Sequence, residues 1–443
     1  MGTIDLTTSM TGMICLAIFI GAYAFVILEE KLHLRKCKPV LFAAGLIWVL
    51  IAFAYKKTGH AEEVSESIRH QLVEFAELFF FLLVAMTYIN AMVYRNVFEG
   101  LKKKLIEKRY SYRKLFWITG LIAFFISPVI DNLTAALILC AVVMAIGKNY
   151  KAFIPIACVN IVVAANAGGA FSPFGDLTTL MVWQKGTVHF WEFFRLFIPA
   201  AVNFLVPAFV MQFFIANEVP EGALDADLQT KKGGGAIVVL FLFTILTTVF
   251  LHLYLHIPAF FGMLLGLTYL TIYDYFLQQR NKRWTKFMHK VLQTPNDPTK
   301  YSVFDGIAQA EWDTLFFFYG VIMAVGGLGF IGYLEWTSEF MYNDLGHTTA
   351  NVLVGVLSAL VDNIPVMFSV LAMHPDMSTS QWLLVTLSAG VGGSMLSVGS
   401  AAGVAIMGQA KGHYTFMQHL KWTPVIILGF AASVGVHLLL NGV

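Results

Sequence analysis

An Asp-Asn pair interrupts two separate apolar stretches of this sequence, at Asp131 and again at Asp362. In both places the pair follows a serine by four residues. An ionised aspartate at the centre of a bilayer costs about 2.5–3.5 kcal/mol on insertion scales. Desolvation raises the pKa of a carboxyl group, whereas a bound cation lowers it. A carboxyl group poised in this way would hold either a proton or a metal ion, and that competition can couple the movement of the two.

A glycine-rich segment follows each Asp-Asn pair, in the same order. Residues 168–176 read Gly-Gly-Ala-Phe-Ser-Pro-Phe-Gly-Asp, and residues 392–400 read Gly-Gly-Ser-Met-Leu-Ser-Val-Gly-Ser. Glycine allows a helix to unwind and a ligand to approach the backbone closely. Unwinding also frees carbonyl oxygens and exposes the dipoles of the half-helix ends. Together with Asn, Ser and Thr side chains, these oxygens can replace the hydration shell of a monovalent cation.

Candidate ligands therefore cluster at the two pairs and the two breaks. The predicted ion- and proton-binding residues are Asp131, Asn132, Thr134, Asn166, Ser172, Asp176, Thr178, Thr179, Ser358, Asp362, Asn363, Ser397 and Ser400. The predicted ligands of the metal cation among them are Asp131, Asn132, Asp176, Thr178, Asp362, Asn363 and Ser397. We expect no catalytic residue and no cofactor, because the bound ions are themselves what is transported.

Each of these residues also has a structural explanation. An Asp-Asn pair at a hairpin tip is ordinary turn and helix-capping chemistry. Asp176 can cap the helix that follows it, and we expect it to cap and to bind together. The hydroxyls of Ser172, Thr178, Thr179 and Ser397 can bond back to helix carbonyls. Because the pair occurs twice beside matching glycine breaks, function is favoured over capping alone.

Acidic side chains also open two of the apolar stretches. Glu74 and Glu77 come just after His70, and Asp313 begins a later stretch. Solvation of these side chains at the membrane interface explains their positions near span ends. The alternative is that they form an entry route for protons.

The composition indicates a membrane protein. The chain has 443 residues, of which 58% are hydrophobic and 13% charged, whereas a soluble domain carries roughly a quarter charged residues. The net charge of +2 points to no nucleic-acid partner, and the four cysteines lack metal-ligand spacing. The apolar stretch near 10–28 is followed by charged residues rather than a cleavage site, so we expect a retained helix.

Ten regions carry about 20 apolar residues, the length that crosses a bilayer. They lie near 10–28, 39–55, 71–94, 152–184, 193–215, 235–255, 257–276, 312–333, 380–410 and 421–441. The two segments with Asp-Asn in the middle are expected to turn back as re-entrant hairpins. This topology puts 24 of the 29 Lys and Arg residues on one side, which the positive-inside rule assigns to the cytoplasm, with both termini outside.

The expected fold is an all-α polytopic membrane protein with about ten transmembrane helices and two hairpins in two inverted repeats. The first repeat covers 1–215, with its hairpin near 115–147 and its broken helix near 152–184. A cytoplasmic linker, 216–234, leads to the second repeat, 235–443, with its hairpin near 346–374 and its broken helix near 380–410. Interrupted helices at matching positions of inverted repeats mark the substrate site of a secondary transporter.

Several other classes of protein fit less well. The sequence has no His-Glu-x-x-His, no Gly-x-Ser-x-Gly and no phosphate-binding loop, so neither an enzyme nor a nucleotide-driven pump is expected. A carrier of a dicarboxylate or arsenite on the same fold would be favoured by Arg or Lys in the broken helices, and none is there. A passive ion channel remains an alternative that inverted hairpins do not favour.

The motifs resemble those of the NhaD family of sodium/proton antiporters in the ion transporter superfamily. The segments that carry the resemblance are 127–136, 166–179, 361–366 and 394–400, and it extends over nearly the whole chain. Dicarboxylate carriers of the superfamily have Ser-Asn-Thr at the hairpin tips, and here Asp131 and Asp362 take the place of the serine. A carboxylate in both tips argues for a cation rather than an anion.

The resemblance implies more than the motifs show. It implies a homodimer in the inner membrane, with a scaffold domain that holds a moving transport domain in an elevator-like mechanism. It also implies export of Na+ and Li+ driven by inward proton flow. Carried over by position, it points to Asp131, Asn132, Asn166, Asp176, Thr178, Thr179, Ser358, Asp362, Asn363, Ser397 and Ser400.

Overall fold

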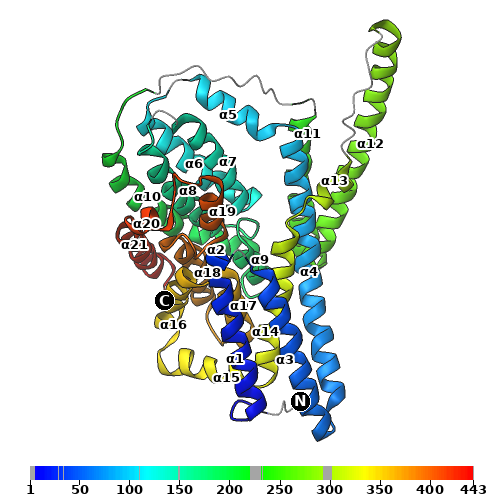
Figure 1. Ribbon diagram of the computed structural model, residues 1–443, viewed down its shortest axis with the longest axis vertical. Helices are drawn as coiled ribbons and strands as arrows, with labels where there is room; N and C mark the ends of the chain where they lie inside the picture. Colours follow the sequence, from blue (N-terminus) through cyan, green and yellow to red (C-terminus); the bar gives the residue numbers. More distant parts are fainter. Residues whose placement is uncertain are drawn as a thin grey trace. The chain divides into compact units, whose positions relative to one another are not determined.

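The structure is a computed structural model that describes residues 5–27, 29–32, 34–108, 110–147, 150–219, 231, 233–292 and 302–442, and all regular elements in these ranges are helices (Figure 1). In the first part of the chain the helices are α1 (Met10–Ile27), α2 (Glu29–Leu32), α3 (Cys37–Thr58), α4 (Ala61–Tyr94), α5 (Val97–Glu107), α6 (Tyr112–Ile130), α7 (Asn132–Ile146), α8 (Phe153–Gly169), α9 (Leu177–Gln184), η2 (Phe190–Leu196), α10 (Phe197–Met211) and η3 (Gln212–Phe214). The second part contains α11 (Gly234–Leu255), α12 (Ala259–Leu292), α13 (Val303–Ala308), α14 (Trp312–Phe330), α15 (Tyr333–Ser338), η4 (Glu339–Asp344), α16 (His347–Leu360), α17 (Asn363–Met373), α18 (Thr379–Gly392), η5 (Gly393–Met395), α19 (Ala401–Gln409), α20 (Phe416–Leu420) and α21 (Thr423–Asn441).

Eight helical stretches in the described ranges are long and apolar enough to cross a membrane. They are Cys37–Lys57, Ala61–Tyr94, Tyr112–Ile130, Phe190–Phe214, Gly234–Leu255, Ala259–Gln279, Trp312–Phe330 and Thr423–Asn441. α6 (Tyr112–Ile130), one arm of the first hairpin, is among these eight, whereas shorter helices supply the other three hairpin arms and the broken helices. The all-α polytopic membrane fold expected from the sequence is confirmed.

Two helices are longer than the apolar spans that predicted them. α4 begins at Ala61 rather than near 71, and α12 continues to Leu292 rather than ending near 276. The added residues are rich in Glu, Lys, Arg and Gln, which are good helix formers. Hydropathy marks the part of a helix that suits lipid, so it does not find a polar extension.

Each Asp-Asn pair lies at a turn between two consecutive helices. α6 ends at Ile130 and α7 begins at Asn132, so Asp131 alone forms the turn, with a positive φ of 67°. Both oxygens of its carboxylate accept hydrogen bonds from Thr134, from the backbone N at 2.8 Å and from Oγ1 at 2.9 Å. These bonds hold aspartate in a backbone region that most residues avoid. The second turn, between α16 and α17, lies at Val361 and Asp362.

Each glycine-rich segment breaks a helix where two stretches of backbone meet. α8 ends at Gly169 and α9 begins at Leu177, whereas α18 and η5 end at Met395 and α19 begins at Ala401. A Cβ on Gly169 would lie 2.7 Å from the Gly175 carbonyl oxygen, and a Cβ on Gly393 would lie 2.5 Å from that of Gly399. Only glycine fits at these two corresponding positions.

The serine that precedes each pair makes the same contact in both segments. Ser127 Oγ donates to the Ala165 carbonyl in α8 at 2.6 Å, and Ser358 Oγ donates to the Ala389 carbonyl in α18 at 2.7 Å. Each bond ties the first arm of a hairpin to the helix that precedes a break. The two repeated segments therefore share this serine hydrogen bond as well as their sequence pattern.

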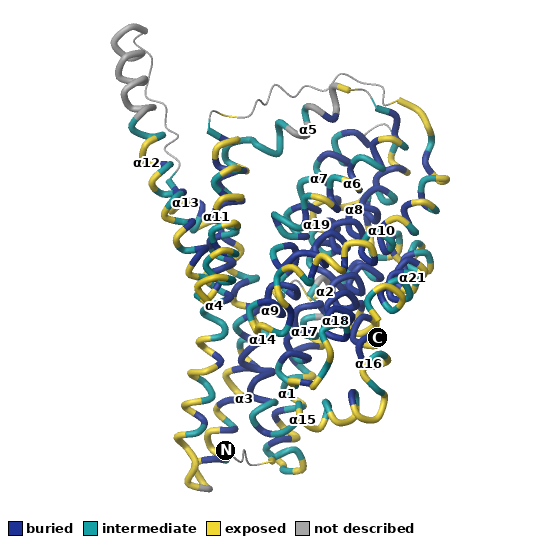
Figure 2. Tube along the Cα trace, turned by 180° about the vertical axis from the view of Figure 1, so that it is seen from behind, coloured by how far each residue is buried: buried dark blue, intermediate teal, exposed yellow. Residues whose placement is uncertain are grey.

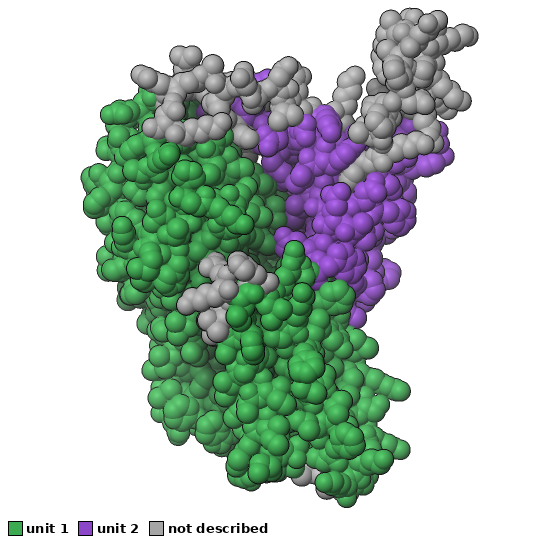
Figure 3. All heavy atoms as spheres, viewed as in Figure 1, with its two compact units in different colours: residues 1–75, 108–223, 313–443 green, residues 76–107, 224–312 purple. Residues whose placement is uncertain are grey.

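The chain divides into two compact units (Figure 3). The first comprises residues 1–75, 108–223 and 313–443, and contains both hairpins and both broken helices. Within it, α8 and α18 are buried along most of their length (Figure 2). The second comprises 76–107 and 224–312, where α11 packs against α12.

Candidate ion-binding site

The tip of the second hairpin contacts the break of the first broken helix. Asn363 Nδ2 donates to Asp176 Oδ2 at 2.8 Å, and both side chains are buried, with exposures of 2% and 5%. Asp176 is also the N-cap of α9, where its other oxygen accepts from the backbone N of Thr178 at 3.5 Å. Asp362, next to Asn363, lies close enough to interact electrostatically with Asp176. The carboxylates of the two repeated segments are therefore neighbours.

A second buried chain of hydrogen bonds joins the first hairpin tip to the second break. Asn132 Nδ2 donates to Asn166 Oδ1 at 2.9 Å, and Asn166 Nδ2 donates to Ser400 Oγ at 3.0 Å. Ser400 in turn caps α19, accepting from the Gly403 backbone N at 3.2 Å. Both hairpin tips are thus connected to the opposite broken helix, although only one connection contains a carboxylate.

Several predicted site hydroxyls are already bonded to backbone carbonyls. Ser172 Oγ donates to Pro128 at 2.9 Å. Thr179 Oγ1 reaches the carbonyls of Ser172 and Asp176, at 2.8 and 2.7 Å. Ser358 Oγ likewise donates to a carbonyl of α18, and Thr134 Oγ1 donates to the Asp131 carboxylate. For these side chains the structure shows contacts of the structural kind, either to a backbone carbonyl or within a helix cap.

Three other buried oxygens at the site have no hydrogen-bond partner among the described residues. They are Thr178 Oγ1, Ser397 Oγ and Asp362 Oδ1. A buried polar atom left unsatisfied costs about 1–3 kcal/mol, so native structures rarely keep one without a ligand or water. Across the described part of the chain no three His, Cys, Asp or Glu side chains gather as a metal cluster. Hydroxyl and carboxylate oxygens of this kind suit a hard monovalent cation better than a transition metal.

Two features of the site were not found from the sequence. Gly390 occupies the position that matches Asn166, and a Cβ there would lie 3.8 Å from Asp176 Oδ2 and 3.9 Å from Thr178 Oγ1. Lys36, from the turn before α3, places its Nζ 2.7 Å from Asp362 Oδ2. It is separated from Asp362 by 326 positions in the chain, so no local pattern could have connected them.

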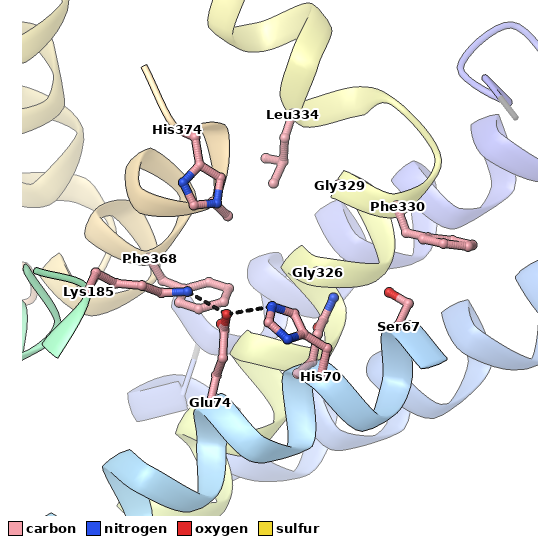
Figure 4. A pocket seen from close by; sticks show the side chains of 12 residues that line it. Ser67, His70, Glu74, Lys185, Gly326, Gly329, Phe330, Leu334, Phe368 and His374 are labelled. Carbon is pink, nitrogen blue, oxygen red and sulfur yellow. Dashed lines mark hydrogen bonds and ion pairs between the residues drawn. The ribbon is translucent and has the colours of Figure 1, made fainter. Parts of the chain in front are cut away.

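A pocket of about 170 Å³, lined by both polar and apolar side chains, lies among α4, α14, α17 and the end of α9 (Figure 4). In it, Glu74 forms an ion pair with Lys185 and lies 3.1 Å from His70 Nε2. Lys185 is the C-cap of α9 and His374 the C-cap of α17, the two helices whose N-caps are Asp176 and Asp362. α9 has eight residues, roughly 12 Å at 1.5 Å per residue. The pocket therefore lies about one short helix away from the carboxylates.

A family model described as a citrate transporter matches residues 6–390 of the chain. A relative named Na(+)/H(+) antiporter NhaD from Alkalimonas amylolytica is 54% identical, with 99% of this chain and 92% of the relative covered. The antiporter of the same name from Vibrio cholerae is also 54% identical, with 99% and 94% covered. The chain belongs to the NhaD family of sodium/proton antiporters.

Membership in the NhaD family confirms the resemblance seen in the sequence motifs. A more distant relative, sodium/proton antiporter 1 of Arabidopsis thaliana, is 29% identical, with 96% of this chain and 72% of the relative covered. All of these relatives are named as transporters, so the chain is a multi-pass membrane transporter and not an enzyme. An anion carrier is not favoured, because the NhaD relatives at 54% identity are named for cations.

Proposed function

We propose that the protein exchanges Na+ or Li+ for H+ at one buried site built around Asp176 and Asp362. The observation that carries this proposal is the hydrogen bond from Asn363 to Asp176, which places a residue of the second hairpin tip on the carboxylate of the first break. The oxygens of Thr178 and Asp362 that lack partners beside this bond supply acceptors for a cation. Ser397, whose hydroxyl is also buried and unpaired, is proposed as a further ligand.

The coupling of the two ions follows from charge. Two carboxylates within electrostatic range repel one another when both are ionised, and burial adds a desolvation cost. Either a proton or a Na+ ion reduces this repulsion, so each ion displaces the other. No cofactor is needed, since the ions themselves are the substrates.

Alternating access is proposed to arise from the two repeats. The shared serine contacts of the hairpins and the shared glycine contacts of the breaks support two equivalent halves, 1–215 and 235–443. The pocket around Glu74 is lined by the C-caps of α9 and α17, and a route from solvent to the site is proposed to begin there. An inner-membrane homodimer with elevator-like motion and external termini remains part of this proposal, from the family resemblance and the charge distribution.

Dequenching of a pH-sensitive dye in everted vesicles or proteoliposomes tests the proposal. NaCl and LiCl should evoke proton release at neutral to alkaline pH, and Asp362→Asn should abolish it. Uptake of a labelled dicarboxylate without any cation response would instead identify an anion carrier. Na+ flux that leaves the proton gradient unchanged would indicate a channel.

The variant Asp131→Asn separates the two explanations of the first tip. The Asp131 carboxylate bonds to Thr134 in the structure, and asparagine also caps helices well. Loss of exchange in a folded Asp131→Asn protein would place this carboxylate in ion binding. Retained exchange would assign it to the turn.

A further inference from the structure

Lys36 forms an ion pair at the tip of the second hairpin. Its Nζ lies 2.7 Å from Asp362 Oδ2, and the two side chains are 22% and 8% exposed. The ammonium group also lies 4.5 Å from the centroid of the Phe317 ring, within the range of a cation–π contact. The Lys36 backbone N donates to Glu29 Oε1 at 3.1 Å, which helps to fix the turn before α3.

The residue before Lys36 makes a second ion pair from the same turn. Arg35 forms an ion pair with Asp313, in the first turn of α14, and Cys37 Sγ lies 3.4 Å from the same carboxylate. The turn before α3 therefore presents two consecutive cations to two acidic residues. One of these acids belongs to α14 and the other to the proposed ion site.

A difference between the two hairpin tips explains why Lys36 can bind at this one. Asp131 uses both carboxylate oxygens to bond Thr134. At the second tip the matching position is Pro365, which has neither a backbone N–H nor a hydroxyl. The Asp362 side chain accordingly makes no capping bond to α17. One of its oxygens accepts from Lys36, and the other is buried with no hydrogen-bond partner in the part of the chain that the structure describes.

We propose that Lys36 is a tethered counter-ion, which takes the place of the transported cation at Asp362 and thereby sets the affinity of the protein for that cation. A primary ammonium and a Na+ ion carry the same charge and compete for the same carboxylate oxygen. In the arrangement seen here the ammonium compensates a carboxylate that would otherwise be buried and unpaired, a costly state. Na+ must displace it to use this oxygen. Lys36 thus acts through its ion pair with Asp362 and does not itself touch the transported ion. This inference rests on the proposed function.

Equilibrium binding of radioactive Na+ to the purified full-length protein, at alkaline pH where protons compete least, tests the competition. Lys36→Gln should bind Na+ about tenfold more tightly than the wild type, whereas Lys36→Arg keeps the positive charge and should stay within about twofold. Lys38→Gln, an exposed lysine of α3 two residues away, is the matched control and should bind as the wild type does. Unchanged or weaker Na+ binding by folded Lys36→Gln would overturn the inference.

A second measurement needs no variant. Acylation of lysines by an amine-specific reagent, followed by mass spectrometry, should become faster at Lys36 when choline is replaced by Na+, and should not change at Lys38. Labelling of Lys36 that is independent of Na+ would also overturn the inference. If the wild type exchanges Na+ for H+ but either measurement contradicts the inference about Lys36, the proposed function still holds. Absence of any Na+-evoked proton release by the wild type would remove the proposed function itself.

Discussion

Asn363 donates a hydrogen bond of 2.8 Å to Asp176, a residue 187 positions earlier in the chain. This bond connects the tip of one hairpin with the break of the opposite broken helix, at a point where both side chains are buried. A neutral amide beside a carboxylate stabilises its ionised form without supplying a counter-charge. The charge is then left for a proton or a cation to neutralise, as ion exchange requires.

Asp176→Asn should fold but lose Na+-evoked proton release by at least about 100-fold. Asparagine is as good an N-cap as aspartate, so α9 should still form, whereas the ionisable group is gone. Dye dequenching in proteoliposomes measures the activity, and size-exclusion chromatography in detergent checks the fold. Normal exchange by the variant would remove Asp176 from the mechanism.

Ser397→Ala should weaken apparent Na+ and Li+ affinity several-fold and leave thermal stability nearly unchanged. The Ser397 hydroxyl is buried and has no hydrogen-bond partner among the residues described by the structure, so its removal breaks no hydrogen bond seen there. Ser358→Ala is the contrasting variant, because Ser358 Oγ donates to Ala389 at 2.7 Å. Ser358→Ala should lower the free energy of unfolding by about 1 kcal/mol. Concentration dependence of dye dequenching and thermal unfolding distinguish the two, and equal effects on both quantities would contradict this separation of roles.

Gly169→Ala should strongly reduce the yield of folded protein. The added Cβ would lie 2.7 Å from a backbone carbonyl oxygen that cannot move without opening the break. Gly408→Ala is the matched control, since a Cβ at Gly408 has nothing within 4 Å and alanine favours the helix by roughly 1 kcal/mol. Expression of a fluorescent fusion with size-exclusion chromatography compares them. Similar yields would show that the break tolerates a side chain.

The stability of the protein should fall as the pH is lowered from about 6.5 to 4, partly because of His419. This residue lies in α20, outside the candidate spans, and burial lowers its pKa to about 4. Its ring nitrogens contact Tyr414 Oη at 2.6 Å and the Ser394 carbonyl at 2.9 Å, which suits a neutral imidazole with the proton on Nε2.

The direction of this pH dependence follows from how many protons the folded and unfolded states bind. Between the folded-state and unfolded-state pKa values, the unfolded chain binds a proton at His419 and the folded protein does not. The free energy of unfolding therefore rises with pH in this range, and the contribution of His419 is complete above the unfolded-state pKa. The contribution is on the order of 3 kcal/mol. Thermal unfolding of His419→Gln in detergent should depend less on pH in this window than the wild type does. An identical pH dependence would show that another group is responsible.

The positions of the hairpins and breaks could be predicted from the sequence, because local chemistry decides them. An apolar stretch must lie in lipid or in the core, an Asp-Asn pair ends a helix, and only glycine fits the close approach at Gly169 and Gly393. The polar extension of α4 could not be predicted from hydropathy, since charged residues form helices outside the bilayer as well.

The sequence by itself determined which side chains are available to an ion, and the tertiary structure decided how each is used. Ser358 precedes the second Asp-Asn pair and Ser397 lies in the second break, yet Ser358 donates to a carbonyl, whereas Ser397 Oγ has no partner among the described residues. The pairing of Asp362 with Lys36 also depends on contacts between segments far apart in the chain. Hydrogen bonds and ion pairs are short-ranged, so a residue's role depends on the few groups that packing brings within about 3 Å of it.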